Sequence, residues 1–186
     1  MDNIKEENKE NKTSVIAIVK QVIYTLFVVC ILSIIFMFSN EAADESSQTS
    51  GGLIEAIVKI FIPNATEEQL AKKVEIFQPI IRKCAHFTLY ASLGFFTYNL
   101  VRTRKKNIFK DKENTPKIYG IITQVFGTLY AISDEIHQTF IPGRSGEIRD
   151  VIIDSLGVFT GLLICIVFLK VVHNFRDKAK QKKKIT

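Results

Sequence analysis

The hydrophobic residues of this chain are gathered into long runs that polar stretches separate. A helix needs about 20 mostly apolar residues to cross a bilayer, and four runs approach that length. The sequence therefore predicts an all-α, polytopic membrane helix bundle with about four transmembrane helices. The expected spans cover residues 22–38, 79–101, 118–140 and 151–172, between a polar N-terminal segment (1–21) and a basic tail (173–186).

The stretch between the first two predicted spans is too short or too charged to cross a bilayer. It starts with a polar, Ser-rich loop at residues 39–52, followed by a short apolar run at 53–61. Thr66 to Gln69 match a capping box, which predicts a helix that runs to about Phe77. Pro79 then fits the first turn of the second spanning helix. We expect these pieces to form short helices at the outer interface.

Lysine and arginine are distributed unequally between the predicted loops. Eighteen lie in the N-terminal segment, in the loop 102–117 and in the tail from Lys170, whereas five lie in segments 39–78 and 141–149. Cytoplasmic loops are enriched in these residues, so both termini are expected to be cytoplasmic in a multi-pass protein of the cell membrane. Residues 22–38 are long for a signal peptide and no small-residue cleavage site follows them, so we expect an uncleaved helix.

Composition narrows the class of protein further. The chain has 186 residues, 47% of them hydrophobic, and a formal net charge of +6, which fits one membrane domain at residues 22–172. Cys30, Cys84 and Cys165 fall inside predicted helices and show no disulfide framework, so we expect buried packing residues. The expected partner is the lipid bilayer rather than nucleic acid, and the oligomeric state stays open.

The stretch "DEIHQTFIPGRSGEIRD", residues 134–150, crowds ionisable groups between two apolar runs. With the predicted topology, the outer ends of three helices place their polar residues at one membrane level. An ionisable group inside a span costs roughly 2.5–3.5 kcal/mol or more, so such groups normally face a partner or a water-filled cavity. We therefore expect these residues to converge in the outer leaflet.

Two kinds of role are open to the converging residues. A histidine beside a carboxylate can act as a general acid or base, and arginine side chains can hold an anionic headgroup or a lipid-linked phosphate. Two histidines with Asp or Glu could instead hold a metal, but no metal-binding spacing of histidines is present. No metal site is therefore expected, and whether a cofactor binds stays open. Candidate catalytic residues are His86, His137, Asp134, Glu135, Asp150 and Asp154, and candidate ligand-binding residues are Arg82, Lys83, Gln138, Arg144 and Arg149.

A purely structural interpretation competes with both roles. The same charges can form a buried ion-pair network that fixes how three helices pack. Gly157 and Gly161 follow Asp154 at helical spacing and allow close helix approach, and Gly127 and Ala131 offer a similar face on the third span. Pro142–Gly143 predicts a turn that directs Arg144 back over the cluster or into headgroups.

These motifs resemble one known family. "RKCAHFTLYASLGFF" (82–96), with "SDEIHQTFIPGRSGEIRDVIIDSLG" (133–157) and the Ser-rich loop, is similar to the VanZ-like membrane proteins over about residues 36–165. One departure is Leu89, where the family often has glutamate just before the tyrosine of the first motif.

The resemblance implies a small polytopic protein of the bacterial cell envelope. Its founding member is associated with resistance to the glycopeptide antibiotic teicoplanin, so we expect lowered susceptibility to glycopeptides or lipoglycopeptides. Two alternatives stay open: a membrane-embedded hydrolase or transferase acting on a lipid-linked envelope component, and a non-catalytic structural or transport protein. The resemblance does not decide whether the protein is an enzyme.

Overall fold

Four long helices make up most of the structure. The computed structural model describes residues 2–40, 51–52, 54–60, 62–64, 66–104 and 115–185, and within these residues it is all-α, without a strand. The prediction of an all-α fold is therefore confirmed. Most of the predicted Ser-rich loop and of the basic loop 102–117 lies outside the described residues. The long helices are α1 (Asp2–Asn40), α3 (Glu67–Arg104), α4 (Thr115–Gln138) and α5 (Ile148–Ile185).

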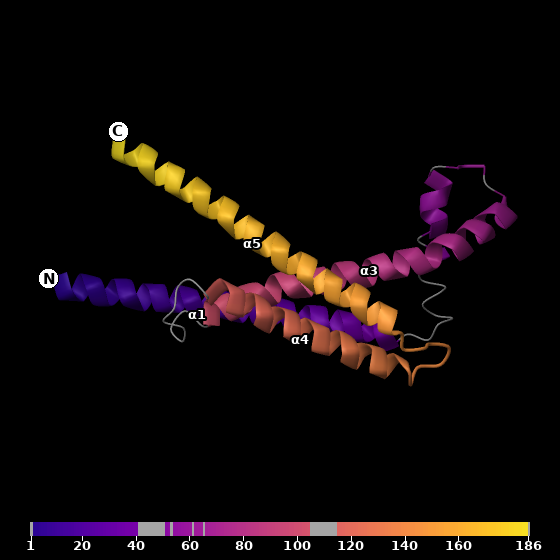
Figure 1. The fold of residues 1–186 in the computed structure, drawn as a ribbon. Helices are drawn as coiled ribbons and strands as arrows, with labels where there is room; N and C mark the ends of the chain where they lie inside the picture. The colour runs from indigo at the N-terminus through magenta and orange to yellow at the C-terminus, as the bar shows by residue number, and fades with distance from the viewer. Residues whose placement is uncertain are drawn as a thin grey trace.

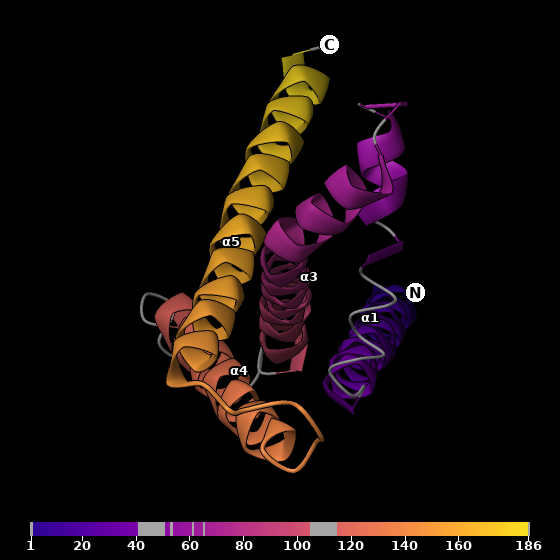
Figure 2. The same ribbon diagram turned by 90° about the vertical axis from the view of Figure 1, so that its right-hand side faces the viewer.

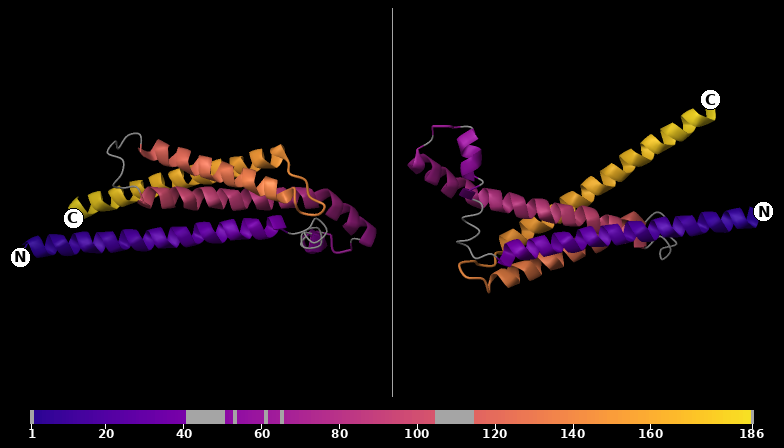
Figure 3. Two further views of the ribbon diagram at one scale, coloured as in Figure 1. Left: turned by 90° about the horizontal axis from the view of Figure 1, so that it is seen from below. Right: turned by 180° about the vertical axis from the view of Figure 1, so that it is seen from behind.

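The helices run alternately up and down in an elongated bundle (Figure 1). Both termini lie at one end, and the connection between α4 and α5 lies at the other. Figure 3 shows α1 on one side of α3 and the pair α4 and α5 on the other. Helix α3 is thus the central element, and its most extensive contact among the described residues is with α5.

Within the described residues, two helices are long and apolar enough to cross a membrane. They are Val15–Asn40, with a mean hydropathy of 2.6, and Ile148–Gln181, with a mean hydropathy of 2.5. Both indicate association with a membrane. Helices α3 and α4 do not reach that hydropathy, because charged and polar residues such as Lys83, His86 and Asp134 interrupt their apolar runs.

Helix α3 corrects one prediction. The sequence predicted a helix to about Phe77 and a new spanning helix from Pro79, but Glu67–Arg104 is one helix with Pro79 inside it. Proline removes one backbone hydrogen bond and can kink a helix without ending it. In Figure 2 the N-terminal part of α3 runs at an angle to the rest.

The start of α3 agrees with the predicted capping box. The Thr66 amide donates to Gln69 Oε1 at 3.1 Å, and the Gln69 amide lies 3.4 Å from Thr66 Oγ1. Residues 54–60 are helical and pack Ile54 and Val58 against Leu70 of α3. This small apolar cluster holds the part of α3 that precedes Pro79.

The close contact between α3 and α5 requires glycine. A Cβ atom on Gly161 would lie 1.7 Å from the carbonyl oxygen of Ala91, and one on Gly157 would lie 2.7 Å from that of Phe87. Next to Gly157 in the chain, the Val158 side chain fills the space over Gly127 of α4. The small residues predicted as packing faces are therefore confirmed as helix contacts.

Helix α1 completes the core beside α3 and α4. Val28, Ile31 and Ile35 of α1 form one buried cluster with Tyr90 and Leu93 of α3. Leu89, the position at which the chain departs from the family motif, is partly buried and packs against this cluster. Of the three cysteines only Cys165 is buried, whereas Cys30 and Cys84 are exposed on the outer surface of the bundle. The prediction of three buried cysteines was wrong for these two.

Candidate functional site

A tight turn brings the chain from α4 back to α5. The Arg144 amide donates to the Ile141 carbonyl at 3.1 Å, and Gly143 has a φ of 75°. Proline followed by a glycine with positive φ is the sequence signature of a type II turn. The predicted Pro142–Gly143 turn is therefore confirmed.

The turn directs Arg144 back over the bundle, one of the two directions that the sequence left open. Its Nη2 donates to the Phe38 carbonyl at the end of α1 at 3.0 Å, and its Nη1 lies 3.5 Å from Gln138 Oε1 of α4. Phe38 accepts this hydrogen bond through its backbone carbonyl, so no side-chain pattern in the sequence indicated it as a partner of Arg144.

The next residues fasten the start of α5 to α4. Glu135 Oε2 accepts a hydrogen bond from the Glu147 amide at 2.8 Å. Gly146 lies against the backbone of α4, since a Cβ there would be 2.6 Å from the Glu135 carbonyl oxygen. This contact fixes where α5 begins and sets the positions of Asp150 and Asp154 on its first turns.

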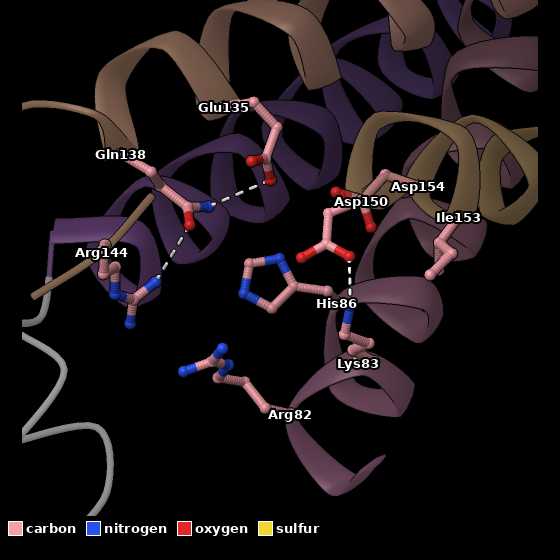
Figure 4. Close-up of a pocket in the computed structure, with 9 residues that line it drawn as sticks. All are labelled: Arg82, Lys83, His86, Glu135, Gln138, Arg144, Asp150, Ile153 and Asp154. Atoms are coloured by element: carbon pink, nitrogen blue, oxygen red, sulfur yellow. Dashed lines mark hydrogen bonds and ion pairs between the residues drawn. The ribbon is translucent and has the colours of Figure 1, made fainter. Parts of the chain in front are cut away.

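A small polar cavity lies where α3, α4 and α5 meet at this end of the bundle (Figure 4). Its volume is about 20 Å³, enough for a water molecule or a small ion. Helix α3 supplies three of its polar side chains, the end of α4 and the turn supply three, and α5 supplies the rest. The cavity is lined by Arg82, Lys83, His86, Glu135, Gln138, Arg144, Asp150, Ile153 and Asp154.

One ion pair closes the side of the cavity between α3 and α5. Lys83 Nζ contacts Asp150 Oδ1, and both side chains are about two-thirds buried or more. Breaking such a pair is costly because it leaves the partner charge without compensation. The structural interpretation of the charges therefore accounts for Lys83 and Asp150.

Asp134 and Asp154 are also buried, but neither forms an ion pair with a basic side chain within the described residues. Asp134 is 5% exposed and Asp154 is 2% exposed. Gln138 Nε2 lies 3.3 Å from Asp134 Oδ2. Among the described residues, Asp154 Oδ2 has no hydrogen-bond partner. Asp134, Glu135 and Asp150 all act electrostatically on Asp154, and Lys83 acts on it in the opposite direction.

The structure separates the two histidines that the sequence grouped together. His86 lines the cavity, and one of its ring nitrogens lies within 4.8 Å of carboxylate oxygens of Asp134 and Asp154. His137 does not line it and instead stacks on Phe36 of α1, with ring centroids 5.1 Å apart. Of the basic candidates, Arg149 is exposed and also lies outside the cavity lining.

The candidate site therefore contains most of the residues named from the sequence. Asp134 lies beside the cavity next to His86 and Asp154. Ile153 is the one lining residue that sequence reasoning missed, because an apolar residue on an apolar helix gives no signal. Tyr90, which shares a face with Arg82 and His86 in sequence, is fully buried and acts electrostatically with Asp134 and Asp154.

The fold and the site together define a membrane-associated helical protein with a polar cavity between three helix ends. The model of the VanZ/LLP1 family matches residues 22–169, which is more than half of the chain. The chain therefore belongs to this family. No curated protein and no solved structure matches the chain at a significant level.

Proposed function

We propose that the protein is a four-span envelope protein that lowers susceptibility to teicoplanin-type glycopeptides or lipoglycopeptides. In this proposal both termini are cytoplasmic and the polar cavity opens to the outer leaflet. The family membership supports the functional class. The observation that carries the proposal is the cavity, with its cationic and acidic side chains, at the end of the bundle opposite to both termini.

The arrangement of α3 and α4 supports four spans even though their mean hydropathy is low. Their polar side chains gather at the cavity, while large apolar side chains such as Ile80, Ile121 and Leu129 face outward and are more than half exposed. Apolar surface of this extent is unfavourable in water and is favourable against lipid. The connection 139–147 lies at the end of the bundle opposite to the termini, which supports this topology.

The basic side chains of the cavity indicate an anionic ligand. Figure 4 shows the guanidinium groups of Arg82 and Arg144 on one side of His86. Guanidinium groups bind phosphate through paired, charge-assisted hydrogen bonds. We infer that a phosphate-bearing headgroup or lipid-linked envelope component binds there and is masked or modified. A hydrolase or transferase is the second candidate, favoured by the position of His86 beside Asp134 and Asp154.

The test is teicoplanin susceptibility of a sensitive host that expresses the wild type or a variant, with the amount of protein in the membrane measured alongside. We expect the wild type to raise the inhibitory concentration, and Arg82→Ala and His86→Ala to abolish that rise at unchanged abundance. Lys72→Ala is the matched control, because Lys72 is exposed on α3 away from the cavity.

Two outcomes would count against the proposal. If the wild type confers no protection, the resistance function is wrong for this member of the family. If the variants disappear from the membrane, the charges of the cavity serve packing, and the structural interpretation holds.

A further inference from the structure

Three residues in or directly beside the cavity come from three different helices. His86 of α3, Asp134 of α4 and Asp154 of α5 each offer one ligand atom, and these atoms all lie within 4.8 Å of one another. We propose that this His–Asp–Asp cluster binds a divalent first-row transition-metal cation of the Zn²⁺ or Mn²⁺ class. The inference deepens the proposed function, because it rests on the same cavity.

The spacing of the ligand atoms suits a single ion. Histidine nitrogens and carboxylate oxygens bind such cations at about 2.0–2.2 Å, so two ligands of one ion are at most about 4.4 Å apart. The three ligand atoms lie within 4.8 Å of one another, which is close to that limit, and small rotations of the side chains bring the atoms within it. The adjoining cavity of about 20 Å³ leaves room for a water molecule as a further ligand.

The environment of Asp154 is the independent observation that indicates a cation. Asp154 is only 2% exposed, and its Oδ2 has no hydrogen-bond partner among the described residues. Figure 4 shows its carboxylate among the side chains that line the cavity. A buried carboxylate without a partner costs several kcal/mol, and three further acids act on this one. A bound divalent cation would offset both penalties.

A neighbouring side chain orients one of the proposed ligands by a hydrogen bond, as is common around metal sites. Gln138 Nε2 lies 3.3 Å from Asp134 Oδ2, which orients that carboxylate. Such supporting hydrogen bonds typically change metal affinity by about 10–100-fold. Lys83 is engaged by Asp150, so it does not occupy the position between His86 and Asp154.

The types of ligand decide the class of cation. Mg²⁺ and Ca²⁺ prefer sites made of oxygen atoms, whereas an imidazole nitrogen suits Zn²⁺ and similar ions, and the two carboxylates also suit Mn²⁺. The sequence favoured no metal because a local histidine motif was absent. Here the ligands come from three helices, and only the packing of α3 against α4 and α5 brings them together.

The test uses the purified full-length chain in detergent after removal of metal with a chelator. Mn²⁺ binding is followed by the loss of the free-ion signal in electron paramagnetic resonance, and Zn²⁺ binding by calorimetry. We expect one ion per chain, displacement of Mn²⁺ by Zn²⁺, and no displacement by an equal concentration of Mg²⁺. No antibiotic is involved, so this inference and the resistance function can fail separately.

Variants assign the binding to the cluster. His86→Gln and Asp154→Asn should weaken Mn²⁺ binding by at least about tenfold. His86→Cys should retain Zn²⁺ and lose Mn²⁺, since a thiolate is a soft ligand, and the retained Zn²⁺ binding would show that the variant is folded. His173→Gln is the control, because His173 forms an exposed pair with Asp177 at 3.2 Å where an adventitious ion would bind.

The inference is overturned by either of two results. One is the absence of stoichiometric binding by the wild type. The other is binding that persists in His86→Gln and Asp154→Asn but disappears in His173→Gln.

Discussion

Arg144 joins three parts of the polar end of the bundle. Its backbone closes the turn after α4, and its guanidinium group contacts the Phe38 carbonyl of α1 and the side chain of Gln138. The carbonyls of the last turn of a helix have no partner within the helix. Arg144 therefore satisfies a group that would otherwise need water, and it does so at the rim of the cavity.

Replacing Arg144 should destabilise this end of the protein. A hydrogen bond to a charged group contributes about 1.5–3 kcal/mol, so Arg144→Ala should lower the free energy of unfolding by about 2 kcal/mol. Thermal unfolding of the purified protein in detergent measures the effect. Arg149→Ala is the matched control, because Arg149 is exposed and its loss should change the unfolding temperature little. Equal effects of the two substitutions would contradict the role of Arg144.

At the residue scale, the sequence indicated which residues belong to the site better than it indicated what each of them contacts. The predicted common membrane level correctly brought Arg82 and His86 together, and both line the cavity. The same reasoning grouped His137 with them, but His137 lies against Phe36 of α1. The spacing within a helix is fixed by its geometry, whereas the face that meets a neighbour is fixed by packing.

At the scale of the helices, the contact between α3 and α5 determines the geometry of the cavity. The contact depends on backbone atoms that approach closely at Gly157 and Gly161 of α5. Helix pairs in membranes are held by such packing, because lipid provides no hydrophobic driving force between them. Asp154 precedes Gly157 by three residues, and His86 directly precedes Phe87, whose carbonyl meets Gly157, so a shift of either helix would separate these cavity residues.

Gly161→Ala tests this contact. The added Cβ would lie 1.7 Å from the Ala91 carbonyl oxygen, and backbone atoms cannot move aside without separating the helices. Overpacking typically costs about 1–3 kcal/mol and sometimes more, so we expect a loss of about 3 kcal/mol and reduced accumulation in the membrane. Gly52→Ala is the control, since nothing lies within 4 Å of a Cβ at Gly52. Normal stability of Gly161→Ala would show that the two helices are less tightly packed.

The elements themselves differ in how far local sequence determines them. The capping box at Thr66 and Gln69 predicted the start of α3, because a cap satisfies backbone groups locally. Pro79 predicted a helix boundary and was wrong. The cluster of Leu70 with Ile54 and Val58 offers the continued helix a packing partner that the local sequence does not reveal.

At the scale of the whole molecule, the bundle has two chemically different ends. The end with both termini carries the basic tail, and the other end carries the turn 141–144 and the cavity. Positive residues remain on the cytoplasmic side of membranes, so this difference predicts orientation as well as shape. Composition indicated this asymmetry from sequence alone, whereas the proposed spanning role of α3 and α4 depends on which of their faces is turned outward.

Labelling of single cysteines tests the orientation directly. The background has Cys30, Cys84 and Cys165 replaced by alanine. Ser145→Cys then lies in the exposed connection after α4, and Gln181→Cys lies in the basic tail, which continues α5 and is exposed there. If four helices span the membrane, a membrane-impermeant maleimide should label Ser145→Cys in intact cells and Gln181→Cys only after permeabilisation. Labelling of both positions in intact cells would mean that α5 does not span the membrane, which would contradict the four-span topology. The reverse pattern would instead turn the cavity to the cytoplasm, where an envelope ligand is not within reach.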